Sequence, residues 1–323
     1  MSLDNKSSIP LISVRDVRKR FNLEAGFFAS IGKHVYAVNG MSFDIGENES
    51  YGLVGESGCG KTTAARLLVR MYKQDSGIIS YRGNNIGAFK SKELKNYRQK
   101  VKYVFQDPAR SLNPRMTVYN VLVSGRRWSN KKENEKLLRE KAAAILEEVG
   151  LSAGDLERRP AEFSGGQRQR ISIARGLLME PDLLICDEVV SALDVSIQAQ
   201  ILNLLMELRK SRNISFLFIA HDLKVACWFC DRIGVMYRGC LAEEAPAKDL
   251  YQNVKHPYTK LLFSSLQKDN SQAAPKGEVR TALAEITGCA FAERCPEASE
   301  RCFKEKPELK EIAAGHKVSC FLY

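Results

Sequence analysis

Short apolar segments of strand length alternate with helical patterns through the middle of the chain. Residues 183–187 (LLICD) and 215–220 (SFLFIA) are almost wholly apolar, which is typical of buried strands. In 134–151 the apolar residues recur three and four positions apart and Gly150 supplies a stop, and 195–210 is a second predicted helix. Because strands alternate with helices, we expect an α/β fold with a mainly parallel sheet.

The two ends of the chain depart from this pattern. Segments 11–21 (LISVRDVRKRF) and 36–45 (YAVNGMSFDI) are expected to form antiparallel strands beside the parallel sheet. After about residue 251 the sequence becomes polar and then rich in cysteine. We therefore predict two parts, residues 1–255 and 256–323.

Composition and charge narrow the class of protein. The chain has 323 residues, 44% of them hydrophobic, with a formal net charge of +11. This is ordinary for a soluble globular protein, and no apolar run approaches the roughly 18 residues that span a bilayer. The N-terminus shows no signal-peptide pattern, so we expect a cytosolic chain unless a partner holds it at a membrane. The basic residues are scattered and no nucleic-acid motif stands out, so they suit a solvated surface or phosphate ligands.

A glycine-rich loop lies between a predicted strand and a predicted helix in residues 50–72. Its sequence, GESGCGKT at 55–62, fits the pattern G-x-x-x-x-G-K-[ST]. The glycines let backbone N–H groups face phosphate oxygens, Lys61 adds a positive charge, and the Thr62 hydroxyl can hold Mg²⁺. The loop therefore predicts a nucleoside triphosphate site, although not what the nucleotide is used for.

Acidic residues end the apolar strand at 183–187. Asp187 is placed to hold Mg²⁺ through water, and Glu188 is placed to polarise an attacking water molecule. Gln106 follows another predicted strand and is expected to sense the metal and the water, and His221 ends the strand at 215–220. Together these residues predict hydrolysis of the nucleotide.

A second glycine-rich helix start lies at 163–167 (FSGGQ). Backbone N–H groups at a helix N-terminus bind anions. The chain thus carries, in this order, the glycine-rich loop at 55–62 (the P-loop), Gln106, FSGGQ, ICDE, SALD at 191–194 and His221. This series resembles the ABC family of ATPases, in which leucine is commoner at the place that Phe163 occupies here. The resemblance implies two ATPase domains that dimerise head to tail, with each ATP between the P-loop of one and the FSGGQ segment of the other.

The likeness extends over nearly the whole chain to ATP-binding subunits of oligopeptide/dipeptide importers. It rests on VFQDPARSLNPRMTV, FSGGQRQRISIAR, SALDVSIQAQILNLL and HPYTKLL. One departure is Val189, because this family usually has proline after the catalytic glutamate. Proline fixes φ and lacks an N–H, so the loop from Glu188 to Ser191 is open to a different shape.

The resemblance implies a P-loop ABC ATPase with a parallel sheet core, an antiparallel β subdomain, a helical signature subdomain and a small Cys-rich C-terminal extension. It implies catalytic roles for Glu188, His221 and Gln106, and Mg²⁺ ligands among Thr62, Gln106 and Asp187. The residues that it implies in ATP binding are Gly55, Ser57, Gly58, Gly60, Lys61, Thr62, Thr63, Tyr36, Ser164, Gly165, Gly166, Gln167 and Asp194.

An aromatic residue before the P-loop normally stacks on adenine in this family. Tyr36 is our candidate. Phe21, Phe27 and Phe28 are alternatives because the segment 22–32 looks inserted, and an aromatic residue there also suits core packing.

The partners and location follow from the same resemblance. It implies two transmembrane permease subunits, an extracytoplasmic substrate-binding protein and a second ATPase, which we expect to be non-identical; no nucleic acid is expected. The chain would lie on the cytoplasmic face of the membrane and power import of peptides. Alternatives are import of a nickel chelate or a sugar by the same engine, or a non-transport ABC ATPase of a soluble assembly or of nucleic-acid processing.

Four of the nine cysteines lie in the last 35 residues: Cys289, Cys295, Cys302 and Cys320. Disulfides are unexpected in a cytosolic chain, and four thiolates close in sequence suggest a metal centre. The spacing differs from zinc-finger patterns and resembles the family's C-terminal [4Fe–4S] segment. We therefore expect a [4Fe–4S] cluster, with zinc as the alternative.

Overall fold

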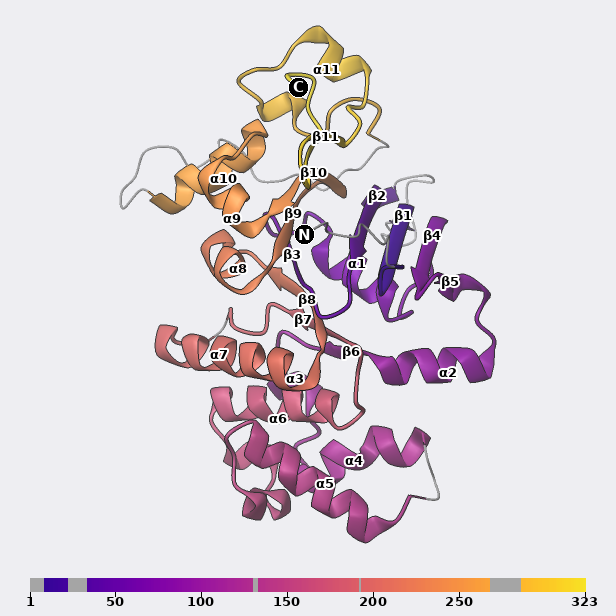
Figure 1. Cartoon of the computed structure of the whole chain (residues 1–323), viewed down its shortest axis with the longest axis vertical. Coiled ribbons are helices and arrows are strands. Elements are labelled where there is room, and N and C mark those ends of the chain that lie inside the picture. The colour runs from indigo at the N-terminus through magenta and orange to yellow at the C-terminus, as the bar shows by residue number, and fades with distance from the viewer. Residues whose placement is uncertain (1–8, 23–33, 130–132, 192, 268–285) are drawn as a thin grey trace, which may run out of the picture. The chain divides into compact units, whose positions relative to one another are not determined.

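A computed structural model describes residues 9–22, 34–129, 133–191, 193–267 and 286–323 (Figure 1). Its contacts divide the chain into two compact units. The first combines Met1–Ala88 with Ile219–Tyr323, and the second is Phe89–Phe218.

The first unit contains an antiparallel sheet with the strand order β2-β1-β4-β5. Its longest pairing joins β1 (Ile12–Asn22) to β2 (His34–Ile45), as predicted for this end of the chain. The sheet is completed by β4 (Ser76–Tyr81) and β5 (Asn84–Asn85). Ile12 and Val14 of β1 and Met41 and Phe43 of β2 are buried, since alternate residues of these strands face the core.

A second set of strands in this unit runs in the order β11-β12-β10-β9-β3. Strand β3 (Ser50–Val54) is parallel to β9 (Arg232–Tyr237), which pairs antiparallel with β10 (Cys240–Pro246). The end of the chain adds β11 (Lys310–Ala313) and β12 (His316–Val318) to the edge of β10. The Cys-rich end of the chain is thus joined to the rest of the first unit by strand pairing.

Helices of the first unit connect these strands (Figure 1). Helix α1 begins directly after the glycine-rich loop, as its position predicts. The helices are α1 (Lys61–Leu68), α8 (Leu223–Phe229), α9 (Ala247–Gln252), α10 (Pro257–Gln267) and α11 (Glu300–Lys304), with 3₁₀ turns at Ile86–Ala88 and Ala292–Arg294.

The second unit contains the strands β6 (Val101–Val104), β7 (Leu183–Asp187) and β8 (Ser215–Ala220), in the order β8-β7-β6. β6 and β7 are parallel, and β8 crosses into the first unit at its last two residues. Every residue of β7 and β8 is buried, which explains their continuous apolar sequences.

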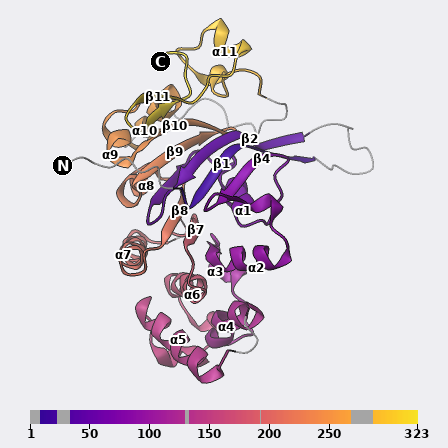
Figure 2. The same ribbon diagram turned by 45° about the vertical axis from the view of Figure 1, so that its right-hand side comes forward.

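Helices α5, α6 and α7 of the second unit lie where helices were predicted, and α4, α5 and α6 pack together as a helical bundle (Figure 2). Asn134 caps the first turn of α5 through its side-chain oxygen, and Gly150 lies just past its end with φ of +75°. The helices are α2 (Ser91–Lys100), α3 (Pro108–Ser111), α4 (Val118–Ser129), α5 (Glu135–Glu148), α6 (Gly165–Leu177) and α7 (Val195–Arg212), with 3₁₀ turns at Ala153–Glu157 and Pro160–Glu162. Within the described ranges, no helix combines the length and apolar character needed to cross a membrane.

Candidate functional site

The glycine-rich loop joins β3 to α1 in the first unit. Lys61, the first residue of α1, is only 4% exposed. Its Nζ donates to the carbonyl oxygens of Gly55 at 2.7 Å and Glu56 at 3.0 Å. The lysine charge therefore lies within the turn of the loop, next to the N-terminus of a helix, and both features favour an anion.

Two glycines of this loop are required by its own fold. Gly60 has φ of +111°, and a Cβ there would lie 2.0 Å from the carbonyl oxygen of Ala37. A Cβ on Gly55 would lie 2.2 Å from the carbonyl oxygen of Met236. Since backbone is packed against both positions, a side chain at either one would distort the loop.

The loop is also held by residues that the sequence analysis missed. The hydroxyl of Tyr258 accepts a hydrogen bond from the backbone N–H of Glu56 at 3.0 Å. Arg294 forms an ion pair with the Glu56 side chain at 2.9 Å. Tyr258 lies in the HPYT segment, so the only signal in the sequence was the family resemblance of that segment.

The acidic residues lie in the second unit, at the end of β7. Asp187 is 3% exposed, and its carboxylate accepts a short hydrogen bond from the hydroxyl of Tyr103 on β6. Gln106 Nε2 donates to Glu188 Oε2 at 2.7 Å. The structure thus brings Gln106 and Glu188 together beside Asp187, and their carboxylate and amide oxygens are of the type that Mg²⁺ prefers.

Glu188 adopts a left-handed backbone conformation, with φ of 49°. Its carbonyl oxygen accepts hydrogen bonds from the Ser191 N–H at 3.1 Å and the Ser191 hydroxyl at 2.9 Å. Val189 and Val190 are buried at 2% and 5% exposure. The turn thus closes with Val189, where the resemblance leads one to expect proline. Its residue with a strained backbone is Glu188, the predicted catalytic residue.

The FSGGQ segment forms the N-terminus of α6 in the second unit. Ser164 Oγ accepts from the Gln167 N–H at 3.3 Å, and Gln167 Oε1 accepts from the Ser164 N–H at 3.0 Å. This reciprocal capping fixes an exposed helix start. A Cβ on Gly165 would meet no atom nearer than 3.9 Å, so the fold of this unit does not demand glycine there.

Two predicted site residues are exposed at the ends of other elements. Asp194 occupies the N-cap position of α7, and its side chain makes no capping bond. His221 follows β8, and the next residue, Asp222, caps α8 by accepting from the Lys224 N–H. His221 and the P-loop belong to the first unit and Glu188 to the second, so their assembly into one site stays a prediction.

The aromatic candidates for adenine stacking differ in their surroundings. Tyr36 lies half-buried on β2, edge-on to His34 with 6.4 Å between ring centroids. The ring of Phe21 packs edge-on against Tyr72 at 5.1 Å and lies under the Lys19 ammonium. Phe21 is thus engaged on two sides. Phe27 and Phe28 lie outside the described residues.

The four C-terminal cysteines line a single cavity of about 80 Å³. Burial raises the pKa of the Cys289 thiol to about 11 and also raises the pKa of Cys295 and Cys320. In the described part of the chain, no three His, Cys, Asp or Glu side chains are arranged as a metal site. The donor chemistry suits a thiophilic metal, but the expected [4Fe–4S] cluster is not supported by this geometry.

Two protein-family models match the chain. Residues 38–191 match the model described as "ABC transporter". Residues 242–302 match "Oligopeptide/dipeptide transporter, C-terminal region". The second match covers HPYT and three of the four clustered cysteines, so the extension is a feature of that type of protein.

Curated relatives and solved structures agree with these models. The chain is 42% identical over 335 residues to the oligopeptide transport ATP-binding protein AppF of Bacillus subtilis, covering all of both chains. It is 40% identical to the oligopeptide transport ATP-binding protein OppF of Escherichia coli, over 96% of this chain and 95% of the other. A dimeric ATP-binding cassette, solved in a post-hydrolysis state with ADP and phosphate, is 25% identical with a TM-score of 0.64, over 73% of this chain and 98% of that one.

Proposed function

The chain belongs to the ABC transporter family, as an ATPase of the oligopeptide/dipeptide type, and from this premise we propose that it powers the import of peptides or similar solutes. The observation that carries the proposal is the full-length similarity to oligopeptide transport ATP-binding proteins, including the C-terminal region. A transported solute would not need to touch this chain, since its site binds phosphates.

We assign the chemistry to two groups of residues, one in each unit. Lys61 and the backbone N–H groups of its loop bind the phosphates, and Tyr36 stacks on adenine. Glu188 orients the attacking water and accepts its proton, while Gln106 holds the Glu188 carboxylate and His221 contacts the γ-phosphate region. The other proposed ATP contacts in the P-loop are Gly55, Ser57, Gly58, Gly60, Thr62 and Thr63.

Mg²⁺ would be held by Thr62, Gln106 and Asp187, and it would neutralise charge on the phosphate oxygens. The place of the Asp187 carboxylate at the end of β7 supports this role, because carboxylate oxygens are ligands that Mg²⁺ prefers. The bond from Tyr103 fixes the orientation of that carboxylate.

The partner is a second ATPase, which we propose to be non-identical. Ser164, Gly165, Gly166, Gln167 and Asp194 would face the nucleotide that the partner holds in its own P-loop. The exposed start of α6 supports this role, since Ser164 accepts from the Gln167 N–H and the other N–H groups of the first helical turn are of the kind that binds an anion. Two permease subunits and an extracytoplasmic binding protein would complete the importer, with this chain on the cytoplasmic face.

Purification of the tagged chain from its own cells tests the proposal. We expect integral membrane proteins, a second ATPase and peptide-stimulated ATP hydrolysis in the purified assembly. Copurification with nucleic acid or with a soluble complex would refute the transport role. If a nickel chelate or a sugar stimulated ATP hydrolysis and peptides did not, the chain would still be a transport ATPase, but the imported solute would be that chelate or sugar.

We also propose that the four clustered cysteines ligate a [4Fe–4S] cluster, with zinc as the alternative. The proposal rests on the four thiols and on the resemblance of their spacing to the family's C-terminal segment. Anaerobically purified protein is expected to be brown with about four irons per chain. Cys302→Ser should bleach it and loosen the tail, with the P-loop still binding ATP, and Cys227→Ser is a matched control outside the cavity. Stoichiometric zinc without iron would reject the cluster, and absence of both metals would reject the metal site.

A further inference from the structure

Arg294 connects the Cys-rich extension directly to the phosphate loop. Its Nη1 donates to Glu56 Oε2 at 2.9 Å and its Nη2 donates to Glu56 Oε1 at 3.1 Å. The two side chains are only 13% and 21% exposed. Such a two-bond arginine–carboxylate pair, largely shielded from water, fixes geometry more strongly than a pair on the surface.

Glu56 is the second residue of the phosphate loop, and each of its polar groups is engaged. Its backbone N–H donates to the Tyr258 hydroxyl, and its carbonyl oxygen accepts from Lys61 Nζ at 3.0 Å. Its carboxylate is held by both guanidinium nitrogens of Arg294. A shift of Glu56 would therefore move the carbonyl group that orients the phosphate-binding lysine.

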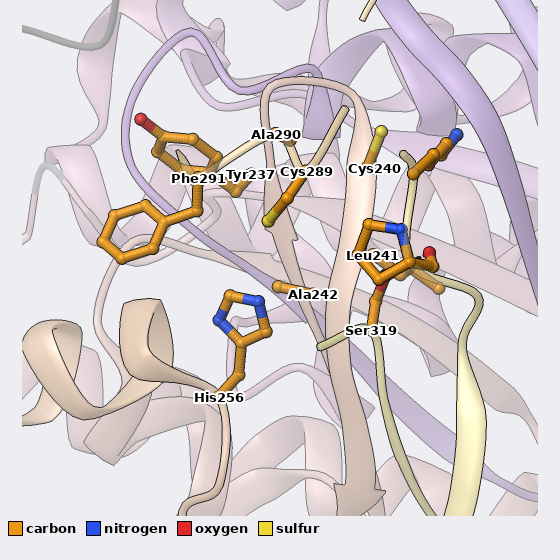
Figure 3. A pocket seen from close by; sticks show the side chains of 11 residues that line it. Tyr237, Cys240, Leu241, Ala242, His256, Cys289, Ala290, Phe291 and Ser319 are labelled. Carbon is orange, nitrogen blue, oxygen red and sulfur yellow. Dashed lines mark hydrogen bonds between the residues drawn. The ribbon is translucent and has the colours of Figure 1, made fainter. Parts of the chain in front are cut away.

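Arg294 is itself held by a cluster of buried aromatic residues, Tyr237, Tyr258 and Phe291. Their ring centroids lie 4.5–5.4 Å apart, and none of the three is more than 2% exposed. Figure 3 shows Tyr237 and Phe291 side by side at one cavity of the extension. Arg294 donates to the Tyr237 hydroxyl at 3.2 Å, and its guanidinium lies over the rings of Tyr237 and Phe291. The arginine is thus positioned before any ligand binds.

Arg294 lies in the segment between two of the cysteines that line the cavity. It ends the 3₁₀ turn Ala292–Arg294, which lies between two of the cysteines. The Ala292 N–H donates to the Cys289 carbonyl at 3.1 Å, and the Cys295 N–H donates to the Ala292 carbonyl at 3.3 Å. One short turn therefore holds two cavity cysteines at its ends and the arginine that reaches the loop.

We propose that Arg294 is a positioning residue for ATP, which holds the phosphate loop through Glu56 and so lets the C-terminal extension set the nucleotide affinity of the ATPase. This inference rests on the proposed function to the extent that the loop binds ATP. It assigns the extension a role in the nucleotide site, in addition to any metal that it holds.

The test is titration of the full-length isolated subunit with a fluorescent ATP analogue, mant-ATP, in the presence of Mg²⁺. Arg294→Gln keeps a polar side chain but removes the positive charge and the paired guanidinium N–H groups that bind both Glu56 oxygens. Affinity is expected to fall on the order of tenfold, as for loss of a shielded charge-assisted hydrogen-bond pair. In the assembled transporter, KM for ATP should rise while kcat changes little, because Arg294 does not touch the reacting atoms.

A matched control lies one residue away. Glu293 pairs with Arg238 at 3.0 Å and is 69% exposed, and no bond joins its side chain to Glu56. Glu293→Gln should change the affinity by less than about twofold. A double-mutant cycle adds specificity: Glu56→Gln combined with Arg294→Gln should weaken binding no more than either change alone.

Wild-type affinity in Arg294→Gln, or strictly additive effects in the cycle, would overturn the proposal. If Arg294→Gln fails to fold, Arg294→Lys and Glu56→Gln carry the same test, and wild-type affinity in both would overturn it. Failure of the unaltered subunit to bind mant-ATP would refute the proposed function together with this inference. Weak mant-ATP binding that is confined to the Arg294 and Glu56 variants would support both the proposed function and the role of Arg294.

Discussion

The chain contains two glycine-rich helix starts, each predicted to bind an anion, and they are built in opposite ways. In the phosphate loop, the lysine is buried in the turn, and backbone oxygens lie 2.2 and 2.0 Å from where Cβ atoms of Gly55 and Gly60 would be. The start of α6 is exposed and capped by its own Ser164 and Gln167, and Gly165 has open space around it.

This difference separates two reasons for glycine. At Gly55 and Gly60 of the phosphate loop, the fold of the first unit excludes larger residues, so glycine is needed even without a ligand. At Gly165, nothing in the second unit excludes a side chain. A requirement for glycine at 165 would therefore come from outside the unit, as the proposed nucleotide of a partner subunit would impose.

The largest effect is expected from Gly60→Ala. The new methyl group would meet the Ala37 carbonyl oxygen in a left-handed conformation, so we expect about 3 kcal/mol or more of lost stability and loss of ATP binding. Chemical denaturation and mant-ATP titration measure both. Gly58→Ala is the control for stability, because Gly58 also has a positive φ, of +76°, but no atom within 4 Å of the added methyl. Equal losses of stability in the two variants would show that the clash is unimportant.

Glu188→Gln should leave both anion sites intact and stop the chemistry. Loss of the general base is expected to lower turnover roughly 10²–10⁴-fold, with unchanged ATP affinity. Phosphate release by the assembled complex measures the turnover, and mant-ATP titration of the subunit measures the ATP affinity. Hydrolysis at the wild-type rate would remove Glu188 from its catalytic role.

Lys61→Ala tests whether the buried loop is the site of this chain's own nucleotide. It removes a charge-assisted contact to the phosphates, so ATP should bind more weakly by about 2–3 kcal/mol. Calorimetric titration of the isolated subunit measures the change. Unchanged affinity would mean that the ammonium group stays on the Gly55 and Glu56 carbonyls when ATP binds.

The smallest effect on the isolated chain is expected from Gly165→Asp. Open space at this position and the favourable place of a carboxylate at a helix N-terminus should keep stability within about 0.5 kcal/mol. ATP affinity of the subunit should stay the same, while hydrolysis in the assembled complex is lost because the carboxylate repels phosphate. Loss of ATP binding by the isolated variant would show that Ser164–Gln167 serves this chain's own nucleotide.

Most elements around these sites could be predicted because their signals are local. Strand β7 has the predicted bounds, since a strand buried on both faces is apolar throughout. Helix α5 (Glu135–Glu148) lies within the segment 134–151 that was predicted to be helical, because Asn134 and Gly150 mark its ends. The predicted α/β fold with an antiparallel β subdomain and a helical subdomain is confirmed.

The contacts that orient the site residues could not be predicted in this way. Tyr103 reaches Asp187 only because β6 and β7 are neighbours in the sheet. Likewise, the phosphate loop gave no hint of the tyrosine that receives the Glu56 N–H, 202 residues further along the chain. Residue type alone does not select one partner among many tyrosines and arginines.

The sequence by itself therefore predicted several strands and helices in their order, the phosphate loop, the acidic strand end, a second glycine-rich helix start and, by resemblance, the family. The local features depend on spacing within a few residues, which the backbone geometry of one strand, turn or helix fixes. Only the tertiary structure decided that Arg294, 238 residues from Glu56, lies against the phosphate loop, and that four cysteines share one cavity. Such contacts depend on how strands pair and side chains pack across long separations, and no local pattern encodes them.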